Sequence, residues 1–230
     1  FLFPALANFA WVKWFEKRPI SSLGFFKKKW FLEIAKGWGV GMLIFSLAFL
    51  LSYLFGGLEL HSVDFSAGTI LYVLSTIPFW FIQGGTEELL TRGWLLPIIN
   101  KRSNLAIAIA VSSSLFGIMH LANAHVTFLS ILSIILSGVF MALYMLKTDN
   151  LWGVAGLHGA WNFAQGNIYG LAVSGSSTGL SFFRFGAKPD AADWISGGAF
   201  GTEGSLFASL VLLAGILYLA WQLKKEKQVS

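Results

Sequence analysis

Two adjacent carboxylates and an arginine lie within a stretch of sequence that is otherwise almost continuously apolar. The stretch reads Gly84-Gly85-Thr86-Glu87-Glu88-Leu89-Leu90-Thr91-Arg92-Gly93. On insertion scales each ionised group at the middle of a membrane helix costs about 2.5–3.5 kcal/mol. Three such groups within six residues therefore indicate a function. We predict that Glu87 activates a water molecule inside a membrane.

Two of the four histidines fall within apolar spans, and each has a partner at helical spacing. His120 follows Phe116 by four residues, and His158 precedes Asn162 by four residues. Residues at i and i+4 share one face of a helix, so His158 and Asn162 are predicted to point the same way. Small neighbours of His158 (Gly156, Gly159 and Ala160) allow another helix or a substrate to approach that face closely.

These residues suffice for hydrolysis of a peptide bond without a serine nucleophile. Antiparallel helices joined near 100–102 would bring Glu87 and His120 to one depth, where they share a water with Glu87 as the base. His158 and Asn162 would donate hydrogen bonds to the oxyanion of the intermediate. His158 lies roughly 10 Å into its span. His158 can meet His120 at that depth only if the helices are tilted, or if the 103–121 helix ends deep in the protein at Asn123.

Composition indicates an integral membrane protein. The chain has 230 residues, of which 56% are hydrophobic and only 12% charged, whereas soluble domains have about 25% charged residues. No cysteine occurs, which excludes disulfides, thiolate metal sites and a cysteine nucleophile. Clusters at Lys27-Lys28-Lys29 and Lys224-Lys225-Glu226-Lys227 indicate contact with an anionic leaflet of the bilayer. A basic groove typical of nucleic-acid binding is absent from the sequence, so no nucleic-acid partner is expected.

An all-α polytopic fold with about seven to eight transmembrane helices is predicted, since a span needs about 20 apolar residues. The apolar run begins at Phe1 without an initiator Met, so we expect further residues upstream. Gly84-Gly85 is expected to break one helix, and Thr86 to cap the next. The expected elements are a first-helix end at 1–14, a basic interfacial segment at 13–36, spans at 37–57, 66–83, 103–121, 127–146, 151–171 and 205–223, and a shorter helix at 86–99.

The chain is predicted to form one membrane domain without a separate soluble part. Within 1–230 we distinguish a helix end and basic segment (1–35), a core with the catalytic helices (36–171), a Gly/Ser-rich loop (172–204) and a last helix with a basic tail (205–230). The sequence does not determine which side of the membrane each end of the chain faces. If the 86–99 helix crosses fully, Lys101-Arg102 lies opposite the basic segment, against the positive-inside rule, yet the chemistry favours a crossing.

The motifs resemble those of a known family. Glu87-Glu88-x-x-x-Arg92-Gly93, Phe116-x-x-x-His120 and His158-x-x-x-Asn162 occur in the order and spacing of the CPBP family of intramembrane proteases. That group includes CAAX proteases, related to the Ras-converting CAAX endopeptidase, and bacteriocin-processing or Abi proteins. Further similarity lies in Ser22-Leu23-Gly24-Phe25, His120-Leu121-Ala122-Asn123 and Trp161-Asn162-Phe163-Ala164-Gln165-Gly166. It covers about residues 20–171.

The resemblance implies a conical intramembrane cavity and a role for each motif residue. It assigns Glu87 and His120 to water activation, His158 and Asn162 to the oxyanion, and a structural ion pair to Glu88 and Arg92. Metal-independent hydrolysis is favoured, because no His-Glu-x-x-His helix occurs. Glu87, His120 and His158 are an alternative three-ligand site for a divalent metal such as zinc. Candidate cavity-lining residues are Phe116, Asn123, Trp94 and Trp161.

The predicted function is an intramembrane endopeptidase that cleaves membrane-associated peptides or proteins, with prenylated CAAX proteins, leader peptides and other membrane proteins as candidate substrates. We expect the bilayer as its environment and a bacterial plasma membrane as its location. Oligomeric state is not determined by the sequence. One alternative is a non-catalytic scaffold or immunity protein, which has no need for His120 and Asn162. Another is a small proton-coupled transporter, which would have an internal repeat, and the sequence shows none.

Overall fold

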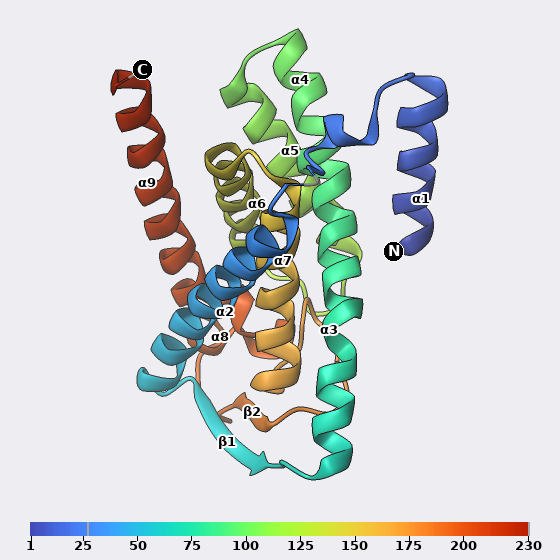
Figure 1. Ribbon diagram of the computed structural model, residues 1–230. Helices are drawn as coiled ribbons and strands as arrows, with labels where there is room; N and C mark the ends of the chain where they lie inside the picture. The colour runs from blue at the N-terminus through green and yellow to red at the C-terminus, as the bar shows by residue number, and fades with distance from the viewer. Residues whose placement is uncertain (27, 230) are drawn as a thin grey trace.

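A computed structural model describes residues 1–26 and 28–229. Lys27, one lysine of the predicted basic cluster, and Ser230 lie outside the described residues. The fold is a bundle of helices with one small sheet (Figure 1). Its α-helices are α1 (Leu2–Ala10), α2 (Trp30–Leu54), α3 (Ala67–Glu88), α4 (Leu96–Arg102), α5 (Leu105–Met119), α6 (Phe128–Thr148), α7 (Leu151–Phe163), α8 (Asp193–Ser196) and α9 (Leu206–Val229).

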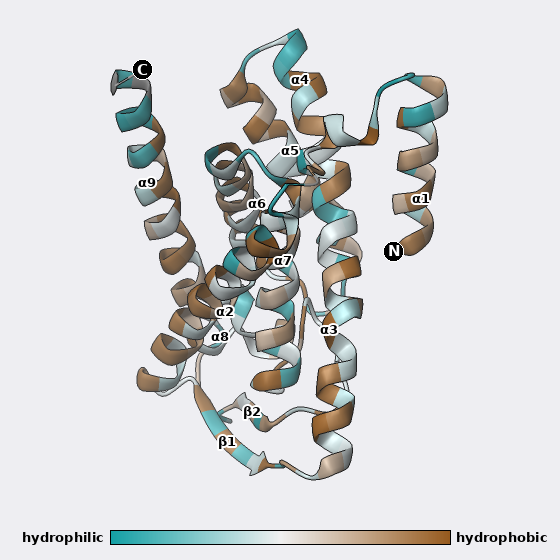
Figure 2. Cartoon of the chain, viewed as in Figure 1, coloured by the Kyte–Doolittle hydropathy of each residue, from teal (hydrophilic) through white to brown (hydrophobic). Residues whose placement is uncertain are grey.

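Five helices of the described chain are long and apolar enough to cross a membrane. They are Trp30–Leu54, Ala67–Arg102, Leu105–Ala122, Phe128–Thr148 and Leu206–Glu226. Hydrophobic residues recur along these helices (Figure 2). The prediction of an all-α polytopic membrane protein is thereby confirmed. The predicted span at 151–171 is α7 followed by a π-helical segment, Ala164–Ile168.

Helix α7 occupies the centre of the bundle, and every residue from Gly153 to Phe163 is buried. Glycines at the helix contacts allow this central position. A Cβ atom on Gly37 of α2 would lie 1.8 Å from the Gly153 carbonyl oxygen, and one on Gly156 would lie 2.6 Å from the Ile34 carbonyl oxygen. Backbones of α2 and α7 therefore touch directly, as small residues at a membrane helix interface permit. The close approach predicted for the face around His158 is present.

Helix α3 continues where the sequence indicated a break. It passes through Gly84-Gly85 into a π-helical segment, Leu89–Leu95, and on into α4, so residues 67–102 cross as one long helix. Within a membrane an interrupted helix leaves backbone groups without partners, which costs more than the low helix propensity of glycine. Gly84 instead allows α3 to approach α7, since a Cβ there would lie 2.9 Å from the Gly159 nitrogen.

The continuous helix places Glu87 within the bundle, about 30 Å along the helix from Ala67. It also removes the disagreement over orientation. A single crossing puts the Lys101-Arg102 turn at the same end of the molecule as the C-terminus of α9 and the end of the first helical segment (Figure 1). The π-helical turn Trp11–Phe15 extends α1 to that end.

The sheet pairs two segments that lie far apart in the sequence. Strand β1 (Leu58–Val63) runs antiparallel to β2 (Phe183–Ala187), with an irregularity between Leu60 and Ser62. The sequence analysis predicted a loop at 172–204 and assigned no element to 58–65, because neither strand has an apolar alternation strong enough to indicate a sheet. The 172–204 connection also contains α8 and two short 3-10 turns, Gly198–Phe200 and Thr202–Gly204. It is therefore more structured than the predicted loop.

Candidate active site

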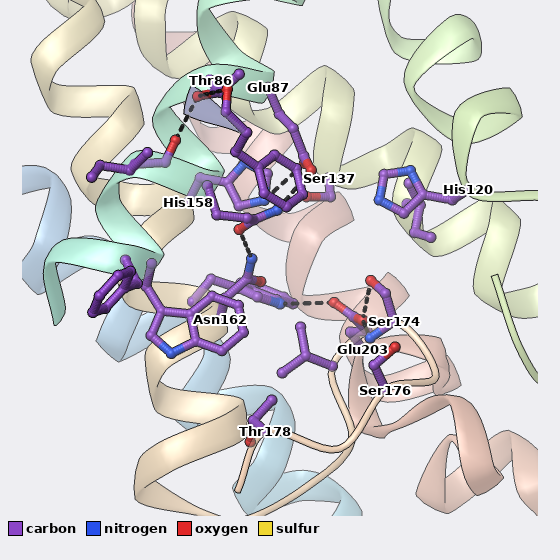
Figure 3. A pocket seen from close by; sticks show the side chains of 18 of the residues that line it. Thr86, Glu87, His120, Ser137, His158, Asn162, Ser174, Ser176, Thr178 and Glu203 are labelled. Atoms are coloured by element: carbon purple, nitrogen blue, oxygen red, sulfur yellow. Dashed lines mark hydrogen bonds and ion pairs between the residues drawn. The ribbon is translucent and has the colours of Figure 1, made fainter. Parts of the chain in front are cut away.

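A cavity of about 1060 Å³ lies between α3, α6 and α7. The four residues predicted to carry out catalysis, Glu87, His120, His158 and Asn162, all contribute to its lining. Figure 3 shows them around one space, with the chain around Ser174 and Thr178 at its lower side. Three segments far apart in the sequence are thus brought together, as the motif order required.

Below the cavity surface, Glu88 and Arg92 form a fully buried ion pair. The guanidinium Nη1 donates to Glu88 Oε1 over 3.1 Å, and both side chains have no exposed surface. The Arg92 guanidinium also lies over the Phe116 ring, 4.7 Å from its centroid. A buried pair of this kind is costly to break from either side. Glu88 and Arg92 thus link the catalytic helix to α5 through Phe116.

His158 contacts both glutamates. Its Nδ1 lies 2.9 Å from Glu88 Oε1 and its Nε2 lies 3.6 Å from Glu87 Oε2. A carboxylate only accepts hydrogen bonds, so Nδ1 carries the proton toward Glu88. The bond fixes the ring plane and directs Nε2 toward Glu87 and the cavity. The sequence analysis did not include this contact with Glu88.

One carboxylate oxygen of Glu87 accepts a hydrogen bond, and within the described chain the other accepts none. The Gln83 side-chain amide donates to Oε1 over 2.6 Å. Oε2 has no hydrogen-bond partner among the described residues. A buried acceptor without a hydrogen-bond partner, on a side chain that lines the cavity, is a candidate general base. Glu87 is half-buried, whereas Glu88 beside it is fully buried.

His120 begins the 3-10 turn that ends α5 (His120–Ala122). Its Nδ1 lies 2.8 Å from the Phe116 carbonyl oxygen, which can only accept, so Nε2 is left as the free ring nitrogen. Within the described residues no hydrogen bond or ion pair joins His120 directly to Glu87. The shared water therefore stays a prediction. Helix α5 ends at Met119, and no residue of the turn that follows is buried, so the helix does not end deep in the protein as one of the two expected arrangements required.

Asn162 points into the same cavity one helical turn after His158. Its amide nitrogen donates to Gln83 Oε1 over 2.7 Å. Gln83 was missed by the sequence analysis. The available signal was its position one turn before Glu87, on the same helix face.

A second missed residue is Glu203, which is buried in the cavity wall. Its carboxylate accepts from the Ser174 backbone at 2.5 Å, from the Ser174 hydroxyl at 2.8 Å and from the Trp161 indole at 3.3 Å. Burial raises the pKa of the Glu203 carboxyl above its ordinary value, while these donors act in the opposite direction. The sequence offered no signal for it, because Glu203 follows the Gly/Ser-rich segment far from the motifs.

Of the four candidate lining residues, Phe116, Asn123 and Trp161 line the cavity. Trp94 does not belong to that lining, and its prediction is corrected. Its indole nitrogen donates to Glu16 over 2.8 Å, on the side of the basic segment. Trp94 follows Glu87 by seven residues, which an α-helix would place on the same face. The π-helical turns of Leu89–Leu95 rotate the residues that follow them.

The alternative metal site was tested on the same geometry. Among the described residues no group of three or more histidine, aspartate and glutamate side chains is arranged to hold a metal ion. Glu87 and His158 approach each other, but in the described part of the chain no hydrogen bond or ion pair brings the His120 ring to either of them. The side chains as arranged do not fit a three-ligand centre.

Comparison with known families identifies the group that the motifs resemble. Residues 67–164 match a family described as type II CAAX prenyl endopeptidase Rce1-like. The matched segment contains all the motif residues, from Glu87 to Asn162. The family predicted from the motifs is confirmed, and the match supports a CAAX-type intramembrane endopeptidase in general terms. A search of curated proteins and of solved structures gives no significant match to the chain.

Proposed function

We propose that this protein is an intramembrane endopeptidase that hydrolyses a peptide bond with water activated by Glu87 and His120. The observation that carries the proposal is that Glu87, whose Oε2 accepts no hydrogen bond from the described residues, shares one cavity with His120, His158 and Asn162. A carboxylate oxygen with no donor in a membrane protein is costly unless it binds water or substrate. The family match over the same residues agrees with this chemistry.

The first step is attack of water on the scissile carbonyl carbon. Glu87 accepts one proton from the water while the oxygen forms a bond to the carbon. His120, with Nε2 free, holds and polarises the same water. The carbonyl becomes a tetrahedral oxyanion. Collapse of that intermediate breaks the carbon–nitrogen bond, and the proton held by Glu87 passes to the leaving amine.

Stabilisation of the oxyanion is assigned to His158 and Asn162. Both are nearly fully buried, so water competes little with their hydrogen bonds. One amide hydrogen of Asn162 is bound to Gln83, and the other is free for the oxyanion. Because Nδ1 donates to Glu88, His158 must also carry a proton on Nε2, as an imidazolium, to donate a hydrogen bond to the oxyanion. The scheme uses only residues of this chain. Zinc-dependent hydrolysis is the alternative, and the metal content of the purified protein distinguishes the two.

The candidate substrates are membrane-associated peptides and proteins, including prenylated CAAX proteins and leader peptides, in a bacterial plasma membrane. The cavity accommodates an extended peptide by volume, and its wall is largely apolar with a few convergent polar groups. That composition suits a segment delivered from the bilayer rather than from bulk water.

A peptide library presented to the purified protein in detergent tests the proposal. Wild type is expected to cleave a subset of the peptides, and Glu87→Ala to leave them intact while keeping its thermal unfolding midpoint within a few degrees. Glu59→Ala, which removes an exposed carboxylate on β1, is the matched control and should cleave as wild type does. A folded Glu87→Ala protein that cleaves normally would refute the mechanism. If His120→Ala and Asn162→Ala both keep the biological effect, the scaffold alternative is favoured instead.

A further inference from the structure

Gln83 connects the two halves of the candidate site. Its side chain lines the cavity on α3, one turn before Glu87. The amide nitrogen donates to Glu87 Oε1 over 2.6 Å, and the amide oxygen accepts from Asn162 over 2.7 Å. One side chain therefore bridges the water-activating carboxylate and the oxyanion donor, which lie on different helices. No motif of the sequence includes it.

The chemistry of the three groups fixes the direction of both bonds. An ionised carboxylate only accepts, so Gln83 must turn its NH₂ group to Glu87. Its carbonyl oxygen then faces Asn162, which must turn its own NH₂ group toward Gln83. The orientation of the Asn162 amide, which the side chain alone leaves free, is thereby set by the charge on Glu87. The second amide hydrogen of Asn162 is left for the substrate.

The same bond selects the reactive oxygen of Glu87. Oε1 is occupied by Gln83, whereas Oε2 has no partner and lies 3.6 Å from His158. Without Gln83 either oxygen would be free to rotate into the water-binding position. Small misplacement of catalytic groups costs much of the rate that positioning contributes.

We propose that Gln83 is a positioning residue that orients Glu87 and Asn162 together for hydrolysis. The inference rests on the proposed function, because it assigns Gln83 a role within that reaction. Gln83 touches no reacting atom in this scheme. Its effect passes through Glu87 and Asn162, so it should alter the chemical step and leave substrate binding almost unchanged.

The test is a double-mutant cycle on cleavage of one library substrate. Gln83→Met keeps the volume of the side chain and removes both hydrogen bonds. We expect kcat to fall by about 10- to 100-fold, below the 10²–10³ typical of losing an oxyanion donor, with KM changed less than about threefold. In an Asn162→Ala background the same substitution should cost several-fold less, since coupled residues are not additive.

Two further variants keep the experiment decisive. Gln222→Met makes the same change on α9 outside the cavity, where the side chain bonds only Tyr218, and should leave kcat and KM unchanged. If Gln83→Met does not fold, Gln83→Ala replaces it, because truncation beside an open cavity leaves no closed void.

The positioning role would be overturned if Gln83→Met lowers kcat by the same factor with Asn162 present as in the Asn162→Ala variant. A change confined to KM would overturn it too. Wild-type kcat in Gln83→Met, with Glu87→Ala inactive, would refute this inference and leave the proposed function intact. Activity in Glu87→Ala would instead refute the proposed function.

Discussion

At the scale of single residues, the charged groups of the apolar core have two distinct tasks. Glu88 is fully buried and binds Arg92 and His158, whereas Glu87 lines the cavity. The pairing of Glu88 with Arg92 could be predicted because i and i+4 spacing is a property of one helix. The bond between Glu88 and His158 could not, since it depends on how α3 and α7 pack.

Removal of Arg92 tests the structural task. In Arg92→Met, Glu88 would stay buried with its counter-charge gone, and we expect a loss of about 3–5 kcal/mol of stability. The measurement is thermal or denaturant unfolding of the purified protein in detergent. The matched control is Arg18→Met, which breaks a partly exposed pair with Glu16 and should cost at most about 1 kcal/mol. Equal losses in the two variants would show that the buried pair has no special role.

At the scale of elements, glycine spacing determines where the catalytic residues meet. Helix α7 carries His158 and Asn162, and it reaches the centre of the bundle because α2 and α3 present glycines to it. The sequence indicated small residues around His158 but interpreted Gly84-Gly85 as a break. A glycine pair is compatible with either a helix end or a close helix contact, and only the partner helix distinguishes them.

Two glycines of α2 provide a matched test of this packing. A Cβ on Gly37 would lie 1.8 Å from the Gly153 carbonyl oxygen, whereas one on Gly39 would have no atom within 4 Å. Gly37→Ala must push α2 and α7 apart and should lose about 1–3 kcal/mol of stability, as overpacked cores do. Gly39→Ala should be neutral or gain up to about 1 kcal/mol through helix propensity. Similar unfolding midpoints for the two variants would contradict the backbone contact.

At the scale of the whole molecule, the basic residues gather at one end. The α4–α5 turn holds Lys101 and Arg102, and the C-terminal end of α9 holds Lys224 and Lys225. At the end with the sheet, the basic residues of the described chain are Arg184 in β2 and Lys188 just after it. The positive-inside rule therefore predicts that the first end faces the cytoplasm. Sequence alone left this open, because the continuity of α3 into α4 decides on which side Lys101 lies.

The absence of native cysteines makes this orientation directly measurable. Ser103→Cys lies in the α4–α5 turn and Asp190→Cys between β2 and α8, and both positions are exposed. In intact bacterial cells a membrane-impermeant maleimide should label Asp190→Cys but not Ser103→Cys. Both should react after the membrane is permeabilised. Labelling of Ser103→Cys alone in intact cells would reverse the assigned orientation.

The candidate site was predictable from sequence to the extent that it consists of charged and polar residues in apolar spans. Glu87, His120, His158 and Asn162 met that criterion and line one cavity. Gln83, although it is polar and lies in the 66–83 span, and Glu203 were missed, because a single amide in a membrane helix and a carboxylate after a polar loop are common features. Their places follow from contacts between helices and with the 172–204 segment, which no local pattern contains.

The central claim is that Glu87 activates the water that cleaves the substrate. Cleavage of one peptide library by wild type and by Glu87→Ala, with the metal content of both proteins measured, tests it most directly. We expect cleavage by wild type and none by folded Glu87→Ala, at substoichiometric metal in both preparations. A metal-free Glu87→Ala protein that cleaves the same peptides at the wild-type rate would contradict the claim.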